Sequence, residues 1–149
     1  MAAKRRKAVT SDDQGPAESN RLNVESALAE TSPPYLVVTV RERVTEASAV
    51  PIFEAISREV RQHGSERVLV DLRESPMQLT ISDIFGVAKL TASAFAGVLQ
   101  RLALLVRPQD LLSEKFFEPS VSSRGVPALV TSDTDEAKYW ITSKAKVPR

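Results

Sequence analysis

The feature that most constrains the fold is a fourfold alternation, within residues 35–142, between short apolar segments and longer segments with helical periodicity. The apolar segments are residues 35–44, 67–72, 101–107 and 126–132, and the helical segments are residues 50–64, 82–97, 110–125 and 133–143. Parallel strands need long, right-handed connections, which the helices would provide. The alternation therefore predicts one α/β domain with a mainly parallel sheet, and it leaves the direction of the first strand open.

The strand segments differ in how their two faces are composed. The run RVLVDL is continuously apolar, which is typical of a strand covered on both faces. The run YLVVTVRERV instead alternates, which predicts one drier and one wetter face. The two faces carry Leu36, Val38 and Val40 on one side and Thr39, Arg41 and Arg43 on the other.

Residues that satisfy unpaired backbone groups mark the ends of the first two helices. Pro51 suits the first turn of the first helix, and Gly64 suits the left-handed position after it. Thr80 and Asp83 have the spacing of a capping box at the start of the second helix, and Gly97 is placed to end it. The expected apolar stripe of the first helix consists of Phe53, Ile56 and Val60.

The last two helices are predicted in the same way. The third begins at Asp110 and is bent or interrupted at Pro119, because proline cannot donate a helical hydrogen bond. The fourth has Asp133 and Glu136 at capping spacing. Its core-facing residues are expected to be Ala137, Trp140 and Ile141.

The regions outside this alternation are predicted from composition. Residues 1–20 contain few large apolar side chains and a basic run, so we expect a disordered tail. Residues 21–34 are predicted to be a linker or a short extra helix or edge strand, which Pro33-Pro34 ends. Residues 143–149 are expected to form a C-terminal tail.

Composition excludes several classes of function. The chain has 149 residues, with 20 Lys and Arg against 19 Asp and Glu, a balance that gives no strong nucleic-acid signal. It has no cysteine and one histidine, so thiolate metal sites and common catalytic triads lack parts. No apolar run approaches the roughly 18 residues that span a bilayer. We expect a soluble, cytoplasmic protein without cofactor or metal that is not an enzyme.

Two titratable residues are weighed individually. His63 ends the first predicted helix, where a positively charged imidazolium stabilises the helix C-terminus. This structural interpretation is favoured over a role as a catalytic base. Asp71 ends an apolar strand, the usual place for functional carboxylates in open α/β sheets. It could receive a phosphoryl group or bind a cation, but a structural carboxylate bonded to loop amides is the favoured interpretation.

Several sequence segments resemble those of the STAS family, most closely its SpoIIAA-like (STAS/SEC14-type) branch. They are VVTVRERVT, RVLVDLRE, RLALLVRP, EKFFE followed by SRGVPALVTSD, and the closing DEAKYWI. The resemblance covers roughly residues 35–142. It implies a STAS-like α/β domain in which a mixed sheet of four or five strands carries about four helices, mostly against one face. It also implies that the first strands are partly antiparallel.

The resemblance further implies a regulatory function. The best-known members of the family are antagonists of anti-sigma factors, and a partner kinase phosphorylates a serine or threonine at the start of the helix after the second core strand. The phrase QLTISDIFG stands there, so Thr80 and Ser82 are the candidate phospho-acceptors. Neither directly follows an aspartate, unlike the family's usual phrase, and either can instead only cap the helix. The expected partner is a regulatory protein, such as an anti-sigma factor or kinase, bound through Ser75, Thr80, Ser82, Asp83 and Phe85.

An alternative function comes from the same resemblance, because the SpoIIAA-like branch has been associated with binding apolar ligands or other proteins. The candidate pocket residues are Ile84, Phe116 and Phe117. Phe116 and Phe117 are adjacent, so they cannot both face the sheet directly from one helix. The predicted function is thus a non-enzymatic, signalling interaction module, and the alternative is a carrier or sensor of a small apolar ligand or lipid.

Overall fold

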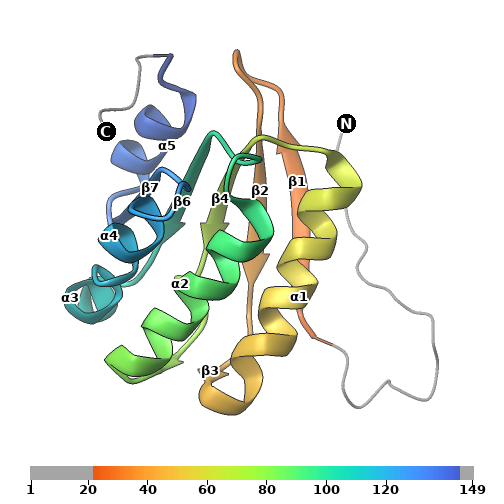
Figure 1. Ribbon diagram of the computed structural model, residues 1–149. Coiled ribbons are helices and arrows are strands. Elements are labelled where there is room, and N and C mark those ends of the chain that lie inside the picture. Colours follow the sequence, from red (N-terminus) through yellow and green to blue (C-terminus); the bar gives the residue numbers. More distant parts are fainter. Residues whose placement is uncertain (1–21, 145–149) are drawn as a thin grey trace.

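The computed structural model describes residues 22–144, which form a five-stranded sheet with helices on both faces (Figure 1). The strand order is β1 (Val24–Ala29), β2 (Tyr35–Val40), β4 (Arg67–Asp71), β6 (Arg101–Leu105) and β7 (Ala128–Thr131). Among these five described strands, β1 and β2 pair antiparallel and the other three pairs are parallel. The short strands β3 (Val44–Thr45) and β5 (Met77–Gln78) form a separate parallel pair. The predicted mixed, mainly parallel sheet is confirmed.

The helices form two unequal layers. One face of the sheet carries α1 (Glu46–His63), α2 (Ile81–Phe95), α3 (Leu111–Glu114) and α4 (Phe117–Ser122), as Figure 1 shows. The other face carries α5 (Thr134–Thr142), and a 3-10 turn, η3 (Pro108–Asp110), precedes α3. Alternate residues of the strands divide between the two layers. Val68, Val70, Leu102 and Leu104 pack under α1 and α2, whereas Leu69, Ala103 and Leu105 pack with Ala137 and Ile141 of α5.

Strand β1 settles the role of part of the segment between residues 21 and 34. It pairs with β2 along its whole length, from Val24 opposite Val40 to Ala29 opposite Tyr35. The extra element is therefore an edge strand of the domain rather than a helix. The predicted disordered tail, residues 1–20, lies outside the described residues, as do residues 145–149 of the predicted C-terminal tail.

Helix α1 begins four residues before the predicted start. Thr45 and Ser48 form a capping box there, with the Ser48 amide donating to Thr45 Oγ1 at 3.2 Å and the Thr45 amide donating to Ser48 Oγ at 2.9 Å. Pro51 consequently lies inside the helix rather than in its first turn. This position is tolerated because Pro51 and the preceding turn at Ala47 are exposed, so water can reach the unpaired carbonyl. The predicted end is confirmed, with Gly64 at a φ of 62°.

The predicted third helix is two short helices, and the break precedes Pro119. Around Lys115 and Phe116 the bonds tighten to a spacing of three residues, as in Phe116 N to Ser113 O at 3.2 Å and Glu118 N to Lys115 O at 3.1 Å. Pro119 belongs to the first turn of α4, where no helical donor is required. Across this tight turn, Glu114 and Phe117 are both buried, and Phe116 between them is exposed.

Candidate functional site

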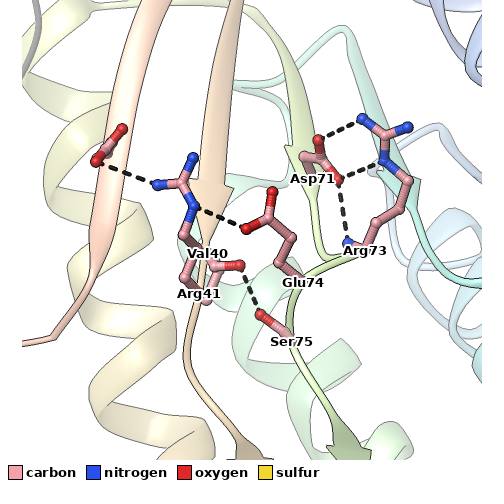
Figure 2. A network of polar contacts seen from close by, with 7 residues as sticks. Val40, Arg41, Asp71, Arg73, Glu74 and Ser75 are labelled. Carbon is pink, nitrogen blue, oxygen red and sulfur yellow. Dashed lines mark hydrogen bonds and ion pairs between the residues drawn. The ribbon is translucent and has the colours of Figure 1, made fainter.

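The loop between β4 and α2 is fixed from within by Ser75. Its side chain is fully buried, and its hydroxyl donates to the Val40 carbonyl at the end of β2 at 2.7 Å (Figure 2). The following residues extend into β5, which pairs with β3. Ser75 therefore ties the loop to the sheet, and its burial removes it from the predicted partner-binding surface.

The start of α2 has the predicted capping box. The Asp83 amide donates to Thr80 Oγ1 at 3.1 Å, and the Thr80 amide donates to Asp83 Oδ2 at 2.9 Å. Two amides that a helix start would leave unpaired are thus satisfied reciprocally. Thr80 and Ser82 are both exposed, and of the two only Thr80 takes part in the cap.

Exposed apolar side chains lie beside this helix start. Phe85 and Phe116 are 43% and 42% exposed, and their rings meet edge to face with centroids 6.3 Å apart. Ile81, 43% exposed, lies one turn before Phe85 on α2. We call Ile81, Phe85 and Phe116 the aromatic patch. It contains the predicted partner residue Phe85, together with Phe116, which was predicted to line a pocket and lies at the surface instead.

A cavity of about 100 Å³ lies between the sheet and the helices α1 and α2. Strands β4 and β6, the two long helices, and the loops at their ends supply an almost wholly apolar lining. Ile84 and Phe117, two of the three predicted pocket residues, contribute to it. Among residues 22–144, the polar residues of the lining are Thr91, whose hydroxyl donates to the Val87 carbonyl at 2.8 Å, and Glu114.

Glu114 combines burial with the absence of a hydrogen-bond partner. It is 5% exposed, and no group within residues 22–144 donates a hydrogen bond to its carboxyl. Burial, helped by the negative charge of Asp110, raises the pKa of Glu114 to about 7. Asp110 itself is held by Arg107, whose Nε lies 2.7 Å from Asp110 Oδ2. Glu114 is therefore the titratable group of this cavity whose charge changes near neutral pH.

The sequence did not single out Glu114 or Asp110 as site residues. In a continuous helix from residue 110, a glutamate between serine and lysine has the pattern of a solvated face. Glu114 instead lies on the same buried side as Phe117, three residues later, and a tight turn separates the two. No local signal in DLLSEKFFE indicated this turn.

The carboxyl ends of β2 and β4 carry a second polar cluster, in which every charge is paired (Figure 2). Arg41 binds Glu25 at 3.1 Å and Glu74 at 2.9 Å. Both carboxylate oxygens of Asp71 accept from the Arg73 guanidinium, and the Arg73 amide adds a bond to Oδ1 at 3.1 Å. We call these five residues the strand-end network.

Asp71 is a structural carboxylate by its contacts. Burial raises its pKa, but the hydrogen bonds from Arg73 and the positive charges of Arg73 and Arg41 outweigh burial and hold the pKa below its ordinary value. Its oxygens are occupied by donors of its own loop, which supports the structural interpretation over phosphoryl transfer.

Other expected features can be located in residues 22–144. His63 is the exposed last residue of α1, and its Nε2 lies 3.3 Å from Ser26 Oγ of β1. Within this range no three His, Asp or Glu side chains gather as a metal site. None of its helices has the length and apolar character to cross a membrane.

Comparisons with known proteins identify the fold. No family model matches the chain, and no curated protein matches it. Among solved structures, the chain is similar to an uncharacterized DUF3478-family protein with a SpoIIAA-like fold from Shewanella loihica PV-4. The two proteins share 11% identity with a TM-score of 0.51, over 89% of this chain and 99% of that one. The SpoIIAA-like fold that the resemblance implied is thereby confirmed.

Proposed function

We propose that the protein is a non-enzymatic regulatory module that binds a protein partner through the aromatic patch and the start of α2. The observation that carries this proposal is the exposed ring pair of Phe85 and Phe116. Large aromatic side chains supply much of the binding energy when an interface covers them. The SpoIIAA-like fold is consistent with such a role.

Regulation of this surface is proposed to act through Ser82 rather than Thr80. Thr80 has a structural task, because its hydroxyl accepts the cap bond from Asp83. Ser82 is exposed and lies three residues before Phe85, so the two are neighbours on the helix surface. A phosphate on Ser82 would add about two negative charges beside an apolar contact and oppose docking. A kinase and an anti-sigma factor remain the partner classes suggested by the resemblance.

The test compares the aromatic patch with an exposed aromatic residue elsewhere. The double variant Phe85→Ser and Phe116→Ser removes the patch, and Tyr139→Ser removes a 78%-exposed ring from α5 on the opposite face. Tagged proteins are used to capture partners from host cells, after circular dichroism has verified their folding. We expect one partner to be retained by wild type and Tyr139→Ser and lost by the double variant. Equal capture by all three proteins would refute this docking surface.

Binding of a small apolar ligand is the second candidate function, and the cavity is the observation that favours it. Its lining is apolar except for Thr91 and Glu114. Cavities lined mainly by aliphatic and aromatic side chains can accept small apolar molecules. Titration with a neutral aromatic probe, followed by amide chemical shifts in NMR spectra, is expected to perturb residues around Ile84 and Phe117. Unchanged shifts at these residues would exclude small aromatic molecules from the cavity.

A further inference from the structure

The Glu114 carboxyl receives no hydrogen bond from residues 22–144, although the residue is only 5% exposed and lines the cavity. A buried polar group without a hydrogen bond is costly, and such groups in folded proteins are normally paired. Thr91, the other polar residue of the cavity lining, directs its hydroxyl to the Val87 carbonyl of its own helix. Water or a ligand must therefore supply a donor to Glu114, and the cavity is the space beside it where a ligand could do so.

The charges around Glu114 select the kind of donor. On η3, Asp110 is paired with Arg107, and at the start of α4 Glu118 is paired with Lys115 at 2.6 Å. Helix α2 has only Asp83, which serves its cap, and Lys89, which is exposed, while β7 has no titratable side chain. Both neighbouring pairs are neutral in sum, so an ionised Glu114 leaves one uncompensated negative charge. An anionic head would be repelled, whereas a cationic donor would compensate it.

We propose that the cavity binds a small amphiphile with an apolar body and a basic, amine-type head, and that Glu114 holds this head. The inference rests on the second proposed function, ligand binding in the cavity. The apolar body packs between α1, α2 and the sheet, and the ammonium group donates to the carboxylate. The raised pKa of Glu114 supports this pairing, since a cation returns the carboxyl to its charged form near neutral pH.

The experiment uses three probes with the same aromatic body: benzylamine, benzyl alcohol and benzoate. Binding to the full chain is measured at pH 7.5 through amide chemical shifts, with perturbations required around Ile84, Val87 and Phe117. We expect benzylamine to bind at least about tenfold more tightly than benzyl alcohol, and benzoate to bind most weakly. Glu114→Gln should remove this tenfold advantage and leave benzyl alcohol binding nearly unchanged. Glu54→Gln, an exposed carboxyl of α1, is the matched control and should bind as wild type does.

The outcomes separate this inference from the function on which it rests. If benzyl alcohol binds in the cavity but benzylamine binds no better, ligand binding stands and the role of Glu114 is refuted. If none of the probes binds, both ideas fail for ligands of this size. Should Glu114→Gln not fold, the wild type is titrated at pH 5.5 and 7.5. Benzylamine must then bind more weakly at the lower pH while benzyl alcohol is unaffected, and equal weakening of both would overturn the proposal.

Discussion

Asp71 in the strand-end network and Glu114 at the cavity are carboxyl groups in opposite surroundings. The Asp71 side chain is 16% exposed, and both of its carboxylate oxygens accept hydrogen bonds from the Arg73 guanidinium. Glu114 is 5% exposed and receives none within the described chain. Their pKa values accordingly move in opposite directions, below the ordinary value for Asp71 and up to about 7 for Glu114.

The contrast distinguishes a polar network that stabilises the fold from a buried carboxyl that receives no hydrogen bond from residues 22–144. The strand-end network is satisfied by its own loops and fixes the path of the chain from β4 toward α2. The desolvated carboxyl of Glu114 destabilises the fold when it is charged. Carboxyl groups with pKa values shifted in this way are found more often at functional sites. The carboxyl at the strand end thus belongs to a structural network, whereas the carboxyl of the short helix α3 is the one on which our ligand proposal rests.

The largest expected effect is the pH dependence that Glu114 gives to stability. Its pKa rises from 4.5 in the unfolded chain to about 7 in the fold, so its stabilising contribution is complete below pH 4.5 and is lost as pH rises to 7. The free energy of unfolding should fall by about 3 kcal/mol over this range. Urea denaturation of Glu114→Gln should lack this fall, whereas Glu54→Gln should retain it. A fall of the same size in Glu114→Gln would assign the effect to another group.

The capping box gives the next effect. Thr80→Ala leaves the Asp83 amide without its acceptor and should lower the free energy of unfolding by about 1 kcal/mol, within a range of about 0.5–2. Ser82→Ala, two residues further along, should change it by less than about 0.5 kcal/mol. Urea denaturation measures both variants. Equal losses would show that Ser82 also supports the start of the helix.

Asp71→Asn tests the carboxyl group whose two oxygens both accept hydrogen bonds within the protein. We expect a loss of about 1 kcal/mol at pH 7, a modest value because the Arg73 side chain is 47% exposed and solvent screens the pair. Because its folded pKa is lowered, the stabilisation is present above the unfolded value of 3.8 and disappears as pH falls through the folded pKa. The difference between Asp71→Asn and wild type should therefore shrink in denaturation curves measured below pH 3. A difference that persists there would indicate packing rather than charge.

Arg41→Gln should give the smallest effect. Both of its partners are more than half exposed, at 52% for Glu25 and 62% for Glu74, and exposed ion pairs contribute less than about 1 kcal/mol. Thermal denaturation in low and in about 1 M salt measures it, and screening at high salt should erase the difference from wild type. A loss above 1 kcal/mol that survives high salt would make Arg41 a stronger element of the network than Asp71.

Four strands of the main sheet and several helix ends could be predicted from sequence because their signals are local. Apolar runs defined β2, β4, β6 and β7, while Thr80 with Asp83 defined the start of α2. The start of α1 was missed because Ser48 fills the place of the usual glutamate in its capping box, and Pro51 gave a competing signal. Local chemistry thus decides the elements wherever one signal is present and misleads where two compete.

The candidate site was less predictable, because it depends on whether a few side chains point into the core or toward solvent. Ile84 and Phe117 were expected in a pocket because of the family resemblance, and they do line the cavity. The exposure of Phe116, the burial of Ser75 and the isolation of Glu114 follow from tertiary contacts around a tight turn and a loop anchored on β2. The hydrogen-bond partners of a side chain, or the lack of them, cannot be predicted from the residues next to it in the sequence.

The antiparallel pairing of β1 with β2 also bears on solubility. Without β1, the backbone N–H and C=O groups of β2 would form an open sheet edge beside the apolar residues Leu36, Val38 and Val40, and such edges readily recruit strands from other molecules. A truncation beginning at residue 35, the boundary that the sequence pattern alone suggests, would therefore create an aggregation-prone protein. A truncation beginning at residue 22 keeps the edge strand and with it the protection against self-association.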